Sequence, residues 1–268
     1  MRVTAPHDMA KVEKDFPAHS ESGFNRIMWI QLEPFLLGQD CPVCALGHQS
    51  AERYLKSLLY EGVTDRFLRA RLRRSLGLCP LHAWQAMDFR EGLFADHVSM
   101  AVIYHDVIGT VVQALKEIRG MCGKPAAGIL LKPRLKKTLR QLVAASRCPL
   151  TDCPACEHQR FAEESGLACL VACITDESVG RTYAEGPGLC LQHLSFALER
   201  TAGKPGFDFL LNCEIVKFEN MGGLLHALQE RFDVRSDARP TREEALAPAE
   251  ALVKLGGRNV VRRKGGDS

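Results

Sequence analysis

Cys41-Pro-Val-Cys44 is followed by Gly77-Leu-Cys79-Pro-Leu-His82, and the same pattern returns as Cys153-Pro-Ala-Cys156 followed by Gly188-Leu-Cys190-Leu-Gln-His193. The spacing is nearly constant, with 35 positions from Cys44 to Cys79 and 34 from Cys156 to Cys190. A Cys-x-x-Cys pair and a Cys-x-x-His pair can together supply three thiolates and one imidazole to a tetrahedral metal ion. The repeated pattern therefore predicts two metal sites.

We expect each site to form from one Cys-x-x-Cys pair and the next Cys-x-x-His pair along the chain. Residues three positions apart at a helix start share one face, and the free backbone N–H groups there favour thiolates. The first set would be Cys41, Cys44, Cys79 and His82, and the second Cys153, Cys156, Cys190 and His193. Four protein ligands of this kind are typical of a structural Zn²⁺ ion, so we predict two zinc sites.

Other readings of the cysteines stay open. Cys148 precedes the second pair and gives Cys148-x₄-Cys153-x₂-Cys156, a spacing similar to that of plant-type ferredoxins, so an iron–sulfur cluster in a redox or sensor protein is the alternative to zinc. The first set has Leu36 where this extra cysteine would fall. Free cysteines can also be small buried hydrophobic residues, which is how we interpret Cys169 and Cys173. A thioredoxin-like motif would need a βαβ surround, which the sequence does not show.

The duplication extends beyond the ligands, because Ala114-Leu-Lys-Glu117 matches Ala227-Leu-Gln-Glu230 at nearly the same offset as the cysteines. We therefore predict an all-α protein of two homologous helical modules, each joined at its helix starts by a Cys₃His site. The predicted divisions are an N-terminal extension (1–35), module 1 (36–120), a basic linker helix (121–147), module 2 (148–233) and a C-terminal tail (234–268) that is disordered in part.

Apolar residues recur at helical spacing after both cysteine pairs. In module 1 we expect helices after Cys44, over Arg66 to Leu76, from Cys79-Pro80 through Met87, and over Glu91 to Ile118, with Thr64-Asp65 as a cap and Gly77 as a stop. Module 2 repeats them near Pro154–Ile174, Leu191–Arg200 and Phe207–Phe232. Thr241-Arg-Glu-Glu244 is typical of a capping box that starts a further helix.

Composition narrows the class of protein. The 268 residues, 46% of them hydrophobic, suffice for one core or two small ones. No uninterrupted apolar run of about 18 residues and no signal-peptide core occur, so we expect a cytoplasmic protein without membrane insertion. Glycine-rich phosphate loops, Gly-x-Ser-x-Gly elbows and His-Glu-x-x-His helices are absent from the sequence, and four protein ligands leave a metal no open position. The pattern thus favours an interaction, adaptor or regulatory protein with a protein partner over an enzyme.

Two basic segments indicate a further alternative, a nucleic-acid-binding regulator. The first is the arginine-rich stretch 66–74 and the second lies between Lys132 and Arg147. Such residues could contact phosphates, but a net charge of only +3 and nearby acidic residues also fit ordinary solvated helix faces. The chain therefore gives weak support to this alternative.

The motifs also resemble a known family. Cys41-Pro-Val-Cys44, Tyr54-Leu-Lys-Ser-Leu-Leu-Tyr-Glu-Gly62, the Gly77-Leu-Cys79-x-x-His82-Ala-Trp84 segment and Cys153-Pro-Ala-Cys156 are similar to a prokaryotic family known only as domain of unknown function 6062. The resemblance covers about Leu36 to Phe232 and implies an all-helical protein with duplicated Cys/His modules and no known reaction. This chain departs from the pattern at Cys148 and at Leu194-Ser195, which replaces Ala83-Trp84.

Overall fold

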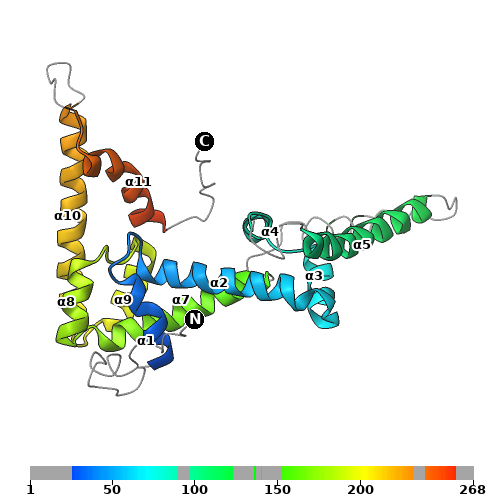
Figure 1. The fold of residues 1–268 in the computed structure, drawn as a ribbon, viewed down its shortest axis with the longest axis horizontal. Helices are drawn as coiled ribbons and strands as arrows, with labels where there is room; N and C mark the ends of the chain where they lie inside the picture. The colour runs from blue at the N-terminus through cyan, green and yellow to red at the C-terminus, as the bar shows by residue number, and fades with distance from the viewer. Residues whose placement is uncertain are drawn as a thin grey trace, which may run out of the picture. The chain divides into compact units, whose positions relative to one another are not determined.

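The computed structural model describes residues 26–89, 97–122, 136, 140, 153–231 and 239–257. Within these ranges the protein is all-helical, as predicted, and no β-strand occurs (Figure 1). The α-helices that the structure describes are α1 (Arg26–Leu32), α2 (Pro42–Tyr60), α3 (Arg66–Ser75), α4 (Pro80–Met87), α5 (Val98–Cys122), α7 (Pro154–Cys173), α8 (Glu177–Glu185), α9 (Leu191–Thr201), α10 (Phe207–Arg231) and α11 (Arg242–Gly256). Two short 3₁₀ turns, Glu33–Phe35 and Gly62–Thr64, complete the described structure.

Side chains at the helix ends explain several of these boundaries. The Asp65 carboxylate accepts a hydrogen bond from the Leu68 amide at 2.8 Å, which fixes the start of α3. Thr241 and Glu244 form the predicted capping box at the start of α11. The end of α3 is closed by Leu76 and Gly77, which both adopt positive φ values, 52° and 104°. The sequence therefore predicts the helix boundaries correctly at these positions.

The chain forms two compact units, and each is built from separated segments. Among the described residues, unit I comprises 26–46, 162–231 and 239–257, and unit II comprises 47–89, 97–122, 136, 140 and 153–161. As a result, α2 begins in unit I and continues into unit II, whereas α7 begins in unit II and continues into unit I. The predicted module boundaries at 36–120 and 148–233, and the duplication itself, stay predictions about the sequence.

Each unit has its own apolar core. The core of unit I gathers buried side chains from α1, α7, α8 and α10, among them Trp29, Leu32, Leu170, Tyr183 and Leu210. Within this unit α11 packs against α10, as Figure 1 shows in orange and red. The core of unit II gathers residues from the later part of α2 and from α3 to α5, including Leu55, Leu58, Leu72 and Ile103. Each fully buried leucine of this kind contributes about 1.5–3 kcal/mol to folding.

The linker helix and the absence of membrane insertion stay predictions. Most of the predicted linker helix (121–147), Cys148 and the last residues of the tail lie outside the described residues. By length and composition alone, the stretch Val98–Gly120 of α5 could cross a membrane, and 17% of its most apolar 18-residue window is buried in the structure. The stretch is not an uninterrupted apolar run, because polar residues such as His105, Asp106 and Gln113 lie within it. The absence of membrane insertion stays a prediction.

Candidate metal centres

All four ligand pairs occupy the same place on their helices. In each case the first cysteine precedes the helix and its carbonyl accepts the first helical hydrogen bond, for example from the Ala45 amide to Cys41 at 3.0 Å and from the Leu194 amide to Cys190 at 2.8 Å. The second ligand follows three residues later, in the first turn. This geometry points both side chains in one direction and sets them among unpaired backbone N–H groups, which favour thiolates.

The glycine before each Cys-x-x-His pair is required by its surroundings. Gly77 has φ of 104°, and a Cβ atom there would lie 2.9 Å from the Tyr104 hydroxyl oxygen. Gly188 has φ of 73°, and a Cβ atom there would lie 2.2 Å from Glu214 Oε1. Any larger residue would combine an unfavourable backbone with a clash. These two glycines thus let the chain turn sharply just before Cys79 and Cys190.

The structure brings all eight predicted ligands into two groups, but it pairs them differently from the prediction. Site I contains Cys41, Cys44, Cys190 and His193, and site II contains Cys79, His82, Cys153 and Cys156. The predicted grouping by position along the chain, in which Cys41 and Cys44 join Cys79 and His82, is therefore wrong. Each Cys-x-x-Cys pair meets the Cys-x-x-His pair from the other half of the sequence. Site I lies within unit I and site II within unit II.

The course of α2 explains the exchange. With 19 residues, α2 is about 28 Å long, so the chain that leaves its far end delivers Cys79 away from Cys44. Leu46 packs against Gly166 in unit I, and the Tyr54 ring stacks on His158 in unit II with 4.2 Å between ring centroids. The start of α7 therefore meets Cys79, and the start of α2 meets Cys190.

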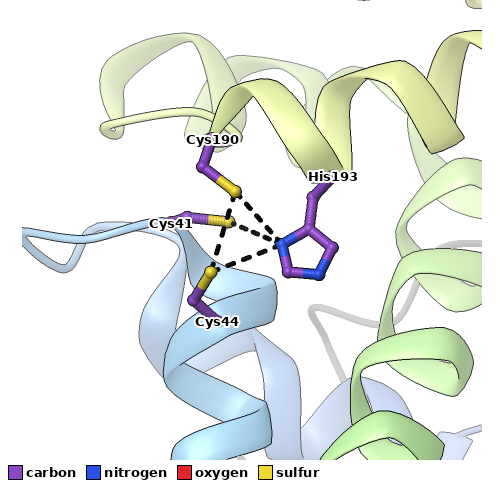
Figure 2. Close-up of side chains that lie close together, drawn as sticks. All are labelled: Cys41, Cys44, Cys190 and His193. Carbon is purple, nitrogen blue, oxygen red and sulfur yellow. Dashed lines mark hydrogen bonds between the residues drawn. The ribbon is translucent and has the colours of Figure 1, made fainter. Parts of the chain in front are cut away.

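The donor atoms of each site converge closely. In site I, shown in Figure 2, the sulfurs of Cys41, Cys44 and Cys190 lie 3.5, 3.4 and 3.3 Å from His193 Nδ1, and the Cys44 and Cys190 sulfurs are 3.7 Å apart. In site II the sulfurs of Cys79, Cys153 and Cys156 lie 3.2, 3.6 and 3.3 Å from His82 Nδ1, and the Cys79 and Cys156 sulfurs are 3.6 Å apart.

These distances fit one ion per site. A tetrahedral Zn²⁺ with Zn–S of about 2.3 Å and Zn–N of about 2.0–2.1 Å places two sulfurs about 3.8 Å apart and a sulfur and a nitrogen about 3.5 Å apart. All four donor atoms of each group lie within 4.8 Å of one another, and all eight side chains are buried. Each group can therefore hold a metal ion without rearrangement of the chain.

The same closeness perturbs the ligands when no metal is bound. Burial alone would lower the pKa of His82, but hydrogen bonds with Cys153 and Cys79 raise this pKa to about 9. Burial likewise opposes a charged His193, but hydrogen bonds with Cys190 and Cys41 raise its pKa to about 11. Hydrogen bonds with neighbouring thiols lower the pKa of Cys153 and Cys190. Each metal-free group thus holds protons that a bound metal would displace.

A buried polar cluster that the sequence does not reveal supports site I. Glu214 of α10 accepts hydrogen bonds from the Tyr183 hydroxyl, from the Leu189 amide at 2.8 Å and from Lys254 Nζ at 2.6 Å. Lys254 also donates to the carbonyl of Pro187 at 2.8 Å. Burial and the nearby Glu214 charge raise the pKa of Tyr183 well above its ordinary value. The cluster holds the loop that ends at Cys190.

Other candidate residues take structural places. Cys169 and Cys173 lie in the core of unit I, outside both metal-ligand groups. The Asp106 carboxylate of α5 pairs with Arg73 at 2.6 Å and with Arg69 at 3.2 Å. Arg71 pairs with Glu157 at 2.7 Å. Three arginines of α3 are thus engaged with carboxylates, and nucleic-acid binding stays a prediction.

Comparison with known proteins places the chain among uncharacterised sequences. Residues 26–258 match the model of a family described as "Family of unknown function (DUF6062)". A relative from Caldicellulosiruptor sp. (strain Rt8B.4), described as an uncharacterized 23.9 kDa protein in the xynA 3′ region, is 28% identical over 197 residues, covering 73% of this chain and 84% of its own length. No solved structure matches.

Proposed function

This chain belongs to the family of unknown function DUF6062, and we propose that it is a zinc protein in which one buried Zn²⁺ ion holds each compact unit together. The observation that carries this proposal is the double convergence of three sulfurs and one imidazole nitrogen within 4.8 Å. Each ion would join two helix starts that are far apart in sequence. Metal binding in such modules supplies folding free energy, with apparent values of about 10–16 kcal/mol for zinc-finger peptides.

The geometry favours a single ion over an iron–sulfur cluster. A cluster distributes its ligands over more than one iron, so sulfurs on different irons lie further apart than two donors of one ion. The sulfur–sulfur distances of 3.7 Å between Cys44 and Cys190 and 3.6 Å between Cys79 and Cys156 match a single tetrahedral ion. Three thiolates and one imidazole are a donor set that Zn²⁺ accepts readily. The iron–sulfur alternative stays open through Cys148.

A structural role follows from the closed coordination shell. Four protein ligands fill a tetrahedral ion and leave no position for water or substrate. The ligand residues are no more than 6% exposed, so solvent has little access to the metal. These features support a scaffold in which the metal maintains the fold and the surface makes the functional contacts.

We propose a protein partner for that surface and a cytoplasmic location. Several large apolar side chains of α5 are exposed, including Ile108 and Leu115, which are 58% and 52% exposed. Exposed apolar residues along one helix are typical of an interaction site. The nine cysteines whose state the structure describes are all free thiols, which suits a reducing compartment.

Elemental analysis tests the proposal. The full chain is expressed without added metal and purified anaerobically, and zinc, iron and acid-labile sulfide are measured per chain. We expect a colourless protein with two zinc equivalents. A brown protein with iron and sulfide would establish the cluster alternative, and a folded protein without bound metal would refute the proposal.

A further inference from the structure

The two histidines differ on the side of the ring that faces away from the sulfurs. In site I, His193 Nε2 lies 3.9 Å from Glu163 Oε2, and the two side chains are only 7% and 18% exposed. In site II, His82 Nε2 is buried and has no hydrogen-bond partner among the described residues. Because Nδ1 faces the metal position in both sites, Nε2 is the atom that carries the N–H group. The Nε2–H group of His193 therefore faces a carboxylate, whereas no described carboxylate faces that of His82.

One position in the sequence accounts for this difference between the two histidines. Glu163 lies seven residues after Cys156 on α7, and the residue seven positions after Cys44 on α2 is Ala51. Seven residues are about two helical turns, so both positions share a face with the ligand cysteine of their helix. Because the ligand pairs are exchanged, Glu163 belongs to unit I and approaches His193, although Cys156 on the same helix belongs to site II.

The end of α11 also covers site I. Gly257, at the end of α11, packs so closely on the site that a Cβ atom there would lie 3.4 Å from the Cys44 sulfur and 3.8 Å from the Cys190 sulfur. The same helix contributes Lys254, which bonds Glu214 and the carbonyl of Pro187 in the loop before Cys190. The end of α11 thus covers the sulfurs and fixes the loop that carries one of them.

We propose that the two sites are unequal: Glu163 is a positioning residue that holds His193 in its metal-binding orientation, so that site I retains its metal and site II exchanges it. This inference rests on the proposed binding of zinc at both sites. A carboxylate beside the non-ligating nitrogen fixes the ring tautomer and orientation and raises ligand basicity, an effect of about 10–100-fold on metal affinity. Among the described residues none gives His82 this support, so the fold of unit II follows the supply of zinc while unit I stays intact.

The test measures release of zinc from the full-length, zinc-loaded protein. An excess of the chromogenic chelator 4-(2-pyridylazo)resorcinol reports the released metal, and short pulses of N-ethylmaleimide followed by peptide mass spectrometry report which thiols have become reactive. We expect two kinetic phases. The fast phase should coincide with labelling of Cys79, Cys153 and Cys156, and the slow phase with labelling of Cys41, Cys44 and Cys190.

Substitution of Glu163 tests its role. Glu163→Gln should accelerate the slow phase by about tenfold and leave the fast phase unchanged. Glu164→Gln is the matched control, because Glu164 is the adjacent, exposed carboxylate on α7. The buried thiols Cys169 and Cys173 distinguish positioning from general destabilisation. If Glu163 positions the ligand, they are labelled no faster in Glu163→Gln than in the unsubstituted protein.

The outcomes separate this inference from the proposed function. Two zinc ions released at equal rates, a fast phase that belongs to Cys41, or an unchanged slow phase in Glu163→Gln would overturn the inequality and leave the zinc proposal intact. Faster labelling of Cys169 and Cys173 together with the ligands would assign Glu163 to stability alone and would also overturn the inference. Protein that contains no zinc at the start would refute the proposed function itself.

Discussion

Replacement of Glu214 by glutamine should destabilise unit I severely. The Glu214 side chain is 1% exposed and that of Lys254 is 10% exposed, so the ion pair between them, at 2.6 Å, is shielded from water. Glu214→Gln removes the charge but keeps the size of the side chain. The glutamine oxygen can still accept hydrogen bonds from both the Tyr183 hydroxyl and the Leu189 amide, whereas the Lys254 ammonium keeps only the Pro187 carbonyl as an acceptor in this described cluster.

The expected cost follows from that unpaired charge. Removal of one partner from a buried ion pair typically costs about 3–5 kcal/mol, because the remaining charge stays desolvated. Since two acceptor contacts can survive in Glu214→Gln, we expect a loss near the lower end, about 3 kcal/mol. For a unit of this size, such a loss corresponds to a decrease in Tm of about 10 °C or more.

Tryptophan fluorescence can assign the loss to unit I. The chain has two tryptophans: Trp29 is buried in the core of unit I at 3% exposure, and Trp84 on α4 is 71% exposed. In a Trp84→Phe background, thermal unfolding followed by fluorescence therefore reports on Trp29. Glu219→Gln, an exposed substitution on the same helix, should change stability by less than about 0.5 kcal/mol. A Glu214→Gln midpoint equal to that of Glu219→Gln would refute the assigned role of the cluster.

Three further outcomes are expected. Cys79→Ser should remove one metal equivalent and make Cys153 and Cys156 reactive toward N-ethylmaleimide, while Trp29 stays buried. If Cys41 and Cys44 became reactive in place of Cys153 and Cys156, the grouping of the ligands would be contradicted. Zinc binding at pH 7 should release protons, because the imidazoles of the metal-free protein have pKa values of about 9 and 11 and are protonated. The apparent affinity for zinc should therefore fall as the pH falls. Calorimetry in buffers of different ionisation enthalpy measures the proton release, and its absence would contradict the described ligand states. Asp106→Asn should lower the free energy of unfolding of unit II by about 1 kcal/mol in urea, because Arg73 and Arg69 lose their shared carboxylate. An unchanged urea midpoint would show that these ion pairs contribute nothing to stability.

Local features of the chain could be predicted from the sequence. Residues at helix ends act within a few positions, so Asp65 and the Thr241 capping box indicate their helices directly. The eight metal donors are equally visible, because a ligand pair needs only a three-residue spacing at a helix start. These predictions depend on chemistry between neighbours along the chain, and the structure gathers all eight side chains into two groups that could hold a metal ion.

The pairing of the ligands could not be predicted in the same way. Four ligand pairs of two alternating types allow two groupings, and both have the same local spacing. The grouping depends on how far α2 carries the chain from Cys44 and on the approach of α7, which are long-range properties. The 19-residue length of α2 was the available signal, because a helix of that length separates Cys44 from the segment that follows it.

Buried polar groups were also invisible in the sequence. Glu214 and Glu163 look like ordinary surface carboxylates of amphipathic helices, since charged residues occur on the outer face of most helices. Their roles depend on Lys254 and His193, which lie 40 and 30 positions further along the chain. Gly188 gives a partial indication, because a glycine two positions before a ligand cysteine indicates a close backbone approach that some other side chain must fill.

The central claim, that each site combines ligands from both halves of the sequence, is tested most directly by the zinc content of two triple variants. Both carry Cys41→Ser and Cys44→Ser; one adds Cys190→Ser and the other adds Cys79→Ser. The grouping in the structure predicts one zinc per chain in the variant with Cys190→Ser, because site II keeps all its ligands, and none in the variant with Cys79→Ser. The reverse result, with one zinc retained only when Cys79 is replaced, would contradict the account.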